Sequence, residues 1–437
     1  MKIKAKNKMG LIFFPAYDWA ISPTHPEREE RLLYTQDQIK EEGLLDIDGI
    51  YEFKPLIADD TQIARAHVCV PDINTQATIS HRISAGGALK ACEIVLNKVV
   101  KKAFALVRPP GHHARRIVHG NRGFCNINIE AVMIEEMRKK YGVKKIAIVD
   151  TDCHHGDGTQ DIYYNDPDVL FISLHQDGRT LYPGTGFPHE FGVGKGFGYT
   201  LNVPLPPHTS DRGYLYVIEN LVLPVLEEFK PEIIINSAGQ DNHFTDPITN
   251  MNISARGYAR LNELINPDIA VLEGGYSVEG ALPYTNCGII MAMAGIDYSG
   301  VIEPDYDENE IMESESIMKR IEKVVSEVLA RWQMKDELRK KHLEGKSVLS
   351  FRRSVYYDEA GIMEYQNEQI YICKDCNSFT IIDSEGDYYR ILAFILTYDI
   401  CEKCRKKAEE KLHKANRGYY NYIYWHDKQN DEYLRIE

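Results

Sequence analysis

The sequence has little of what a membrane-spanning or secreted protein needs. No apolar stretch approaches the roughly 18 to 20 residues that cross a bilayer, and after a basic start the apolar run 11–16 ends at Asp18, too short for a signal peptide. Lysine and arginine number 51 against 65 aspartate and glutamate residues, a net charge of -14. This shortage of positive charge argues against a nucleic-acid partner. We therefore expect a globular cytoplasmic protein with no membrane partner.

Cysteine is also scarce, with nine residues in a chain of 437. An odd number does not suit a disulfide framework, and four of the cysteines form the two CxxC pairs 373–376 and 401–404. We therefore expect a metal site in a reducing compartment. Because the composition changes near these pairs, we predict a first domain over 1–333, a charged linker over 334–350 and a small second domain over 351–437.

Short apolar runs alternate with longer mixed segments through the first domain. The runs are rich in β-branched residues and lack polar alternation, as expected for strands buried on both faces. We predict an α/β fold with a doubly wound, mostly parallel sheet, closed by a helix with an apolar stripe over 317–332. The predicted strands span 10–14, 104–107, 145–150, 169–174, 232–237 and 269–273.

Polar side chains follow four of these strands, and ligands of open α/β sheets bind beyond the carboxyl ends of the strands. Asp152 and His154 are two residues apart after one strand, so both side chains point the same way, and Asp241 follows another strand. Two carboxylates and one imidazole leave coordination positions open, as in a catalytic zinc site. The alternative is a loop that only caps the next helix, which the polar residues at the other strand ends disfavour.

The remaining polar groups suit acid–base chemistry. His112 and His113 follow strand 104–107, and Asp150 and Asp157 are the nearby aspartates not assigned to the metal. A carboxylate paired with a neutral imidazole sets its tautomer and raises its basicity, so two dyads are expected, one of them holding the general base. Tyr276 follows two glycines and is a candidate donor to an oxyanion.

The motifs RPPGHHA, GFC, DTDCHHGDGTQ, SLH, LYPGTG, NVPL, SAGQDNHFTDP and LEGGYS occur in this order over 11–332. They resemble the zinc-dependent histone deacetylase superfamily, which includes bacterial histone deacetylase-like amidohydrolases, acetoin-utilisation proteins and acetylpolyamine amidohydrolases. The RPPGHH form looks more like the class II and bacterial branches. The resemblance implies an arginase-like fold and hydrolysis of an N-acyl amide. It implies these roles: zinc ligands Asp152, His154 and Asp241; general base His113 with Asp157; second dyad His112 with Asp150; and carbonyl polarisation by Tyr276.

Further residues match the family position by position. THPEREERL resembles the family's N-terminal stretch and makes Arg31 the basic residue below the active site. The resemblance implies a substrate-binding set of Gly123, Phe124, Tyr182, Ile248 and Gly275, with the two aromatic rings flanking an aliphatic stem. It also implies two monovalent-cation sites that family members fill with potassium, one of Asp150, Asp152, His154, Ser173 and Leu174 and one of Tyr163, Asp166, Val169 and Tyr199.

Two positions depart from the family pattern. Ile129 and Glu130 replace part of the loop after GFC, which puts the packing of that loop in doubt. Ile248 stands where polyamine-selective members place a gatekeeping glutamate. An apolar residue offers a cationic polyamine no partner, so an acyl-lysine or a similar neutral stem is favoured.

The second domain carries CxxC-x24-CxxC, a spacing close to that of zinc ribbons. Four thiolates fill a tetrahedral site completely, so Cys373, Cys376, Cys401 and Cys404 predict a structural zinc in a zinc-ribbon-like domain. A basic run over 403–417 precedes an aromatic run over 419–425. This pattern occurs at nucleic-acid surfaces, but a solvated helix followed by a partly buried strand is the favoured interpretation. A docking surface for a substrate protein or a second subunit is an alternative.

The sequence therefore predicts a zinc-dependent deacylase with an appended zinc-ribbon module, acting on acyl-lysine in proteins. A small-molecule amidohydrolase acting on acetylated polyamines or similar amines is the first alternative. The second is a non-catalytic protein that binds acyl-lysine and recruits partners, although an intact set of metal-site and dyad residues weighs against it.

Overall fold

The computed structural model describes residues 3–17 and 19–436. An eight-stranded sheet forms the centre of the N-terminal domain, and every neighbouring pair of strands is parallel. All carboxyl ends therefore lie at one edge of the sheet. In sheet order the strands are β2 (Asp48–Phe53), β1 (Lys4–Phe14), β4 (Lys102–Val107), β10 (Ile269–Leu272), β9 (Ile233–Ala238), β6 (Ile146–Asp150), β7 (Val169–Gln176) and β8 (Thr200–Leu205).

Both faces of this sheet are buried, which explains its continuous apolar strands. In β4, Phe104 and Leu106 belong to one core cluster, while Ala103, Ala105 and Val107 belong to the other. The first cluster includes residues of α1 (Glu30–Glu41), α7 (Asp211–Val217), α8 (Leu223–Phe229), α9 (Ala255–Ile265), α10 (Leu282–Ala294) and α12 (Glu315–Gln333). The second includes residues of α2 (Asp60–Ala66), α4 (Ile79–Leu96), α5 (Ile129–Tyr141) and α6 (Asp157–Tyr163). The predicted doubly wound sheet is confirmed.

All six predicted strands form, but the two edge strands of the sheet were not predicted. The sequence of β2, DGIYEF, mixes polar and apolar residues, and β8 contains Pro204. Edge strands need less apolar sequence and tolerate proline, because one side of the strand makes no ladder hydrogen bonds. Their sequences therefore lack the signal that marks the central strands.

The C-terminal domain is a second sheet of six strands with one helix. Its strands are antiparallel except for the parallel pair β14 and β15. The predicted basic run begins within α14, and Trp425 of the aromatic run is buried in β15 against the same core as Ala408 of the helix. The elements are β11 (Val348–Tyr357), β12 (Ile362–Tyr371), β13 (Phe379–Gly386), β14 (Arg390–Leu396), α14 (Glu402–His413), β15 (Tyr422–Asp427) and β16 (Glu432–Ile436).

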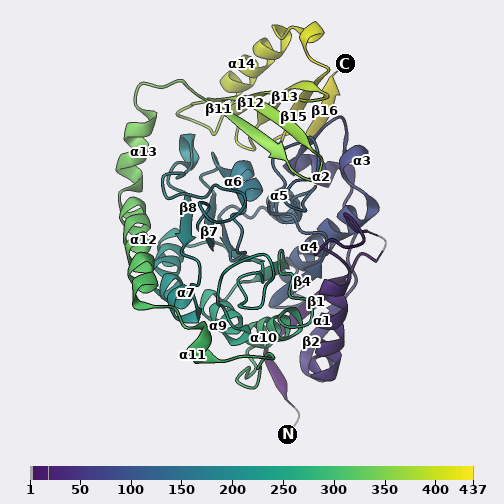
Figure 1. The fold of residues 1–437 in the computed structure, drawn as a ribbon. Coiled ribbons are helices and arrows are strands. Elements are labelled where there is room, and N and C mark those ends of the chain that lie inside the picture. Colours follow the sequence, from purple (N-terminus) through teal and green to yellow (C-terminus); the bar gives the residue numbers. More distant parts are fainter. Residues whose placement is uncertain (1–2, 18, 437) are drawn as a thin grey trace.

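Residues 334–350 connect the two sheets along one side of the molecule (Figure 1). They contain α13 (Lys335–Leu343) and the start of β11. The helix is charged but packed, because the Arg339 guanidinium lies 4.7 Å from the centre of the Tyr199 ring and His342 stacks on Phe197. The connection is therefore held against the N-terminal domain.

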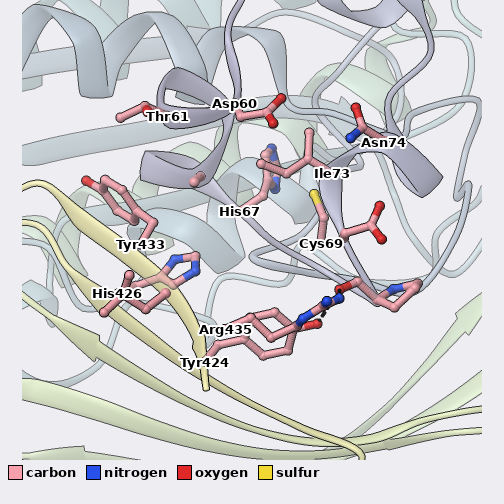
Figure 2. A pocket seen from close by; sticks show the side chains of 14 residues that line it. Asp60, Thr61, His67, Cys69, Ile73, Asn74, Tyr424, His426, Tyr433 and Arg435 are labelled. Carbon is pink, nitrogen blue, oxygen red and sulfur yellow. Dashed lines mark hydrogen bonds between the residues drawn. The ribbon is translucent and has the colours of Figure 1, made fainter. Parts of the chain in front are cut away.

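The two domains share an apolar interface. Short strands β3 (Val68–Cys69) and β5 (Ile117–Val118) pack against residues of β13, β14 and β15. Beside this cluster, the Tyr424 hydroxyl and the Arg435 guanidinium both donate to the carbonyl of Pro71, at 2.8 and 3.0 Å. Figure 2 shows this part of the interface, where β15 and β16 face α2 and α3 (Ile73–Gln76) across a cavity. Among the described residues, no helix is long and apolar enough to cross a membrane.

Candidate active site

Four adjacent strands deliver the predicted catalytic residues to one place. Strands β4, β10, β9 and β6 are consecutive in the sheet, and Asp150 at the end of β6 is in register with Ser237 of β9. The loops after these strands therefore start at the same level. They bring together the paired histidines, the aspartates and Tyr276, although the first histidine and the tyrosine are more than 160 positions apart in the sequence.

Asp152, His154 and Asp241 form a buried group that suits a metal ion. Nδ1 of His154 lies 2.7 Å from Oδ2 of Asp241 and 3.2 Å from Oδ1 of Asp152. The other oxygen of each carboxylate accepts a backbone N–H, from Gly274 to Asp152 and from Cys153 to Asp241, each at 2.7 Å. Oδ1 of Asp152 also accepts the backbone N–H of His154 at 2.8 Å, so the backbone fixes both oxygens of Asp152 and one oxygen of Asp241.

The backbone around this group leaves no room for side chains. A Cβ atom on Gly239 would lie 2.0 Å from Oδ2 of Asp152, and one on Gly274 would lie 2.5 Å from Oδ2 of Asp241. Two carboxylates and one imidazole at this spacing fit a divalent transition metal with open coordination positions, as in catalytic zinc sites. The residues present therefore fit the expected ion.

The two predicted dyads both form. His113 Nδ1 lies 2.9 Å from Asp157 and His112 Nδ1 lies 3.2 Å from Asp150. Burial and the adjacent His112 lower the pKa of His113 to about 3, which leaves its imidazole neutral. Burial also acts to lower the pKa of His112, but the carboxylates of Asp152 and Asp150 outweigh it and raise that pKa well above its ordinary value. The surroundings of the two imidazoles thus shift their pKa values in opposite directions.

Tyr276 is 7% exposed and faces the site from the loop after β10. Its backbone N–H donates to Oδ2 of Asp246 at 2.8 Å, and the Arg31 guanidinium lies 5.0 Å from the centre of its ring. Burial raises the pKa of the Tyr276 hydroxyl well above its ordinary value, so the hydroxyl stays a hydrogen-bond donor. Asp246, in the loop after β9, therefore orients the tyrosine loop.

A cavity of about 250 Å³ leads to these groups. Phe124 and Tyr182 stand on its walls, with ring centres 5.6 Å from Tyr276 and 5.2 Å from His113 respectively. Gly275, predicted to bind substrate, uses its carbonyl to accept from Nε of Arg31 at 2.7 Å. The lining residues are His113, Gly123, Phe124, His154, Leu181, Tyr182, Ile248, Tyr276 and Asp358. The last of these belongs to the C-terminal domain and was not predicted.

A buried ion-pair network below the tyrosine loop was predicted only in part. Arg31 was expected there, and its Nη1 lies 2.9 Å from Glu27, which also bonds Nη2 of Arg108 at 2.6 Å. All three side chains are fully buried. Glu27 lies within THPEREERL and Arg108 within RPPGHH, so the motifs contained both residues without indicating that they pair.

The residues of the two predicted monovalent-cation sites are placed as follows. Ser173 Oγ lies 2.8 Å from Nδ1 of His175. At the second site the Asp166 carboxylate is paired with Arg138, at 2.6 and 3.0 Å, and the guanidinium lies 5.9 Å from the centre of the Tyr163 ring. The carbonyls of Leu174, Tyr163 and Tyr199 accept hydrogen bonds from Tyr214, Asp166 and Phe171. Val169 begins β7. Potassium binding stays a prediction.

Two buried glutamates beside the dyads were not predicted as functional. Oε2 of Glu273 accepts the backbone N–H groups of Gly111 and His112, at 2.7 and 3.0 Å, and so fixes the histidine loop. Glu130, one of the departures from the family pattern, accepts from the Ser237 hydroxyl at 2.5 Å. Ile129 and Glu130 are the first two residues of α5, both are buried, and the Asn128 side chain caps the helix. Burial and the neighbouring Glu273 raise the pKa of Glu130 well above its ordinary value.

This shift predicts the effect of Glu130→Gln on stability. A carboxyl group whose pKa rises on folding destabilises the native state at every pH above its unfolded-state pKa, here about 4.5. Because glutamine has nearly the same shape and no charge, we expect Glu130→Gln to increase the free energy of unfolding at pH 8. Urea denaturation should show this gain shrinking as the pH falls toward 4.5. A gain of equal size at pH 5.5 and pH 8 would contradict the electrostatic origin.

The four cysteines of the two CxxC pairs converge as predicted. Cys373, Cys376, Cys401 and Cys404 place their sulfur atoms within 4.8 Å of one another, and Sγ of Cys373 and Cys401 are 4.0 Å apart. The first pair follows β12 and the second pair begins α14. Four thiols at this spacing fit a closed tetrahedral metal site. It lies in the C-terminal domain, apart from the Asp–His–Asp group.

Comparisons with known proteins agree with this geometry. Residues 69–287 match the model of the histone deacetylase domain. A probable deacetylase from Archaeoglobus fulgidus is 48% identical over 324 residues, which cover 68% of this chain and 89% of the relative. A histone deacetylase-like amidohydrolase from Pseudomonas aeruginosa is 35% identical over 258 residues, covering 57% of this chain and 67% of the relative.

Among solved structures, the crystal structure of the HDA15 HD domain superposes with a TM-score of 0.66 at 26% identity. The superposition covers 78% of this chain and 100% of that domain. The resemblance inferred from the motifs is thereby confirmed by sequence and by structure. This chain belongs to the histone deacetylase family.

Proposed function

We propose that this protein is a zinc-dependent deacylase that hydrolyses the amide of acylated lysine side chains in proteins. The observation that carries the proposal is the convergence of three kinds of group at the end of one narrow cavity. These are the Asp152–His154–Asp241 group, the neutral His113 and the Tyr276 hydroxyl. A deacylase needs each of them, for Lewis acidity, proton transfer and stabilisation of the carbonyl oxygen.

Asp152, His154 and Asp241 would hold the zinc, which supplies Lewis-acid activation of a water molecule and of the amide carbonyl. His113 takes the proton of the attacking water, because its Nδ1 is engaged with Asp157 and its Nε2 remains the basic atom. Tyr276 donates its hydroxyl proton in a hydrogen bond to the carbonyl oxygen as negative charge develops there. The C–N bond then breaks, and His113 or His112 gives a proton to the leaving amine. The products are a carboxylic acid and a free amine.

The cavity walls favour an extended, uncharged stem. The Phe124 and Tyr182 rings flank the approach to the site, and Ile248 lies at its mouth with 36% of its surface exposed. The four methylene groups of a lysine side chain match such walls, because apolar stems gain from burial between aromatic faces. Acyl-lysine fits this cavity on those grounds.

A small acylated amine is the second candidate. Ile248 offers a cationic amine no partner, but the carboxylate of Asp358 lines the same cavity. An ammonium group near the mouth would gain from that charge. This observation favours acylated diamines or polyamines, and it was not available from the sequence motifs.

The test is release of free acid from acyl-lysine peptides, acetyl to octanoyl, and from acetylputrescine and acetylspermidine, with zinc-loaded protein. We expect the peptides to turn over, and Tyr276→Phe to lower kcat by about 10² to 10³, the usual cost of removing one oxyanion donor. Turnover of the acetylated amines alone would support the second candidate. Zinc-loaded protein that binds acyl-lysine but hydrolyses none of the substrates would overturn both and support a binding protein.

A further inference from the structure

We propose that the C-terminal domain completes the active site, and that Asp358 is a positioning residue that fixes two walls of the substrate cavity. This inference rests on the proposed deacylase function. It assigns a role to the hairpin turn between β11 and β12, residues 358–361, which reaches the cavity from the second sheet. The Asp152–His154–Asp241 group and the two dyads all come from the N-terminal domain. The turn therefore contributes to the wall of the substrate cavity and not to the catalytic groups.

Asp358 holds two parts of the cavity at once. Its Oδ1 accepts the backbone N–H of Gly123 at 3.0 Å and the hydroxyl of Tyr182 at 3.3 Å. These residues belong to loops that lie about 60 positions apart in sequence, and both contact the imidazole of His113. A single carboxylate therefore sets the spacing between the walls.

Gly123 packs directly against the imidazole of His113. Its φ is +54°, and a Cβ atom built on it would lie 2.5 Å from Cδ2 of His113. The glycine backbone is thus packed against the imidazole. Glycine adopts positive and negative φ about equally readily, so its own backbone does not hold it in this conformation. The hydrogen bond from its N–H to Asp358 is therefore a specific constraint on this wall.

The hairpin that carries Asp358 is firmly anchored. The Tyr357 hydroxyl donates to the carbonyl of Ile117 at 2.9 Å and bonds Glu364 at 2.8 Å, all within the buried interface. His119 bonds the Ser384 hydroxyl at 2.8 Å. Gly120 lies so close to the turn that a Cβ atom on it would be 2.6 Å from Cβ of Ala360. The turn is therefore a fixed wall rather than a mobile lid.

The same hairpin also connects to the dyad of His113. Arg353 of β11 lies 2.5 Å from Asp161, which pairs with Arg115 at 2.8 Å. Arg115 in turn lies 3.0 Å from Asp157, the partner of His113. Removing the hairpin would therefore leave Asp161 with one cation fewer, beside the carboxylate that orients the general base.

The test is Asp358→Ala in the full-length zinc-loaded protein. Because a hydrogen bond to a charged group contributes more than a neutral one, we expect KM for the best substrate to rise about tenfold, while kcat stays within about twofold because the transition-state groups are intact. Asp358→Asn keeps an acceptor oxygen and should restore most of the affinity. Tyr182→Phe removes one of the two bonds and should combine with Asp358→Ala less than additively.

A matched control and a second measurement separate this inference from the proposed function. Asp387→Ala removes a carboxylate from another turn of the same domain, where Asp387 accepts the N–H of Met363 at 2.9 Å, and should leave KM unchanged. Binding of an alkyl hydroxamate probe, which needs no turnover, should weaken about tenfold in Asp358→Ala for the same reason. The inference is overturned if Asp358→Ala binds the probe as the wild type does, or if Asp387→Ala weakens binding equally.

Discussion

Asp241→Ala will abolish both metal binding at the Asp–His–Asp group and hydrolysis. Asp241 would supply one of the three ligands of the proposed zinc site, and its Oδ2 lies 2.7 Å from Nδ1 of His154. Two remaining ligands do not hold a catalytic zinc, which ordinarily has three protein ligands. Metal analysis should therefore find one equivalent of zinc fewer than in the wild type, while the equivalent expected at the four cysteines is retained. Release of acid from the substrate should fall below detection.

His113→Ala is the matched comparison, because it removes the proposed general base and leaves Asp152, His154 and Asp241 in place. We expect it to retain the metal and to lose about 10² to 10⁴ in kcat, the usual contribution of positioned acid–base catalysis. Loss of metal from His113→Ala, or full metal content in Asp241→Ala, would contradict the assigned roles. Far-UV circular dichroism of both variants at 25 °C should match that of the wild type, which excludes misfolding as the cause.

The candidate site could be predicted from sequence because its residues directly follow strands of a parallel sheet. Asp152 and His154 are two residues apart after a strand whose apolar character is unmistakable, and Asp241 follows another such strand. Since all strands run the same way, residues after different strands meet at one edge. No long-range contact had to be guessed to bring the three together.

Asp358 could not be predicted by that reasoning. It lies 235 positions from Gly123, in a turn whose sequence resembles any exposed hairpin turn. Its position depends on how one domain docks on the other, through contacts such as Tyr357 to Ile117 that carry no periodic pattern. The edge strands β2 and β8 were missed for a different reason, because polar residues and Pro204 interrupt their apolar runs.

We expect Cys376→Ser to abolish metal binding at the proposed four-cysteine site and to destabilise the C-terminal domain. Cys376 is 1% exposed and packs in the same apolar cluster as Phe379 and Phe394. A structural zinc contributes about 10 to 16 kcal/mol of apparent binding free energy to small domains, which is as large as the whole stability of a typical domain. Hydrogen exchange should therefore accelerate strongly in β13 and β14 and stay slow in β4, which has its own core.

Cys287→Ser is the matched control, since it changes a buried thiol in α10 that is outside the cluster. It should keep both metal equivalents and leave exchange in β13 unchanged. Because β12 runs from the turn that carries Asp358 to the first cysteine pair, Cys376→Ser should also raise KM about tenfold, as Asp358→Ala does, if the hydrogen bonds of the carboxylate are lost with the fold of the hairpin. Unchanged KM in a variant whose C-terminal sheet exchanges freely would mean that the N-terminal domain forms the substrate cavity alone.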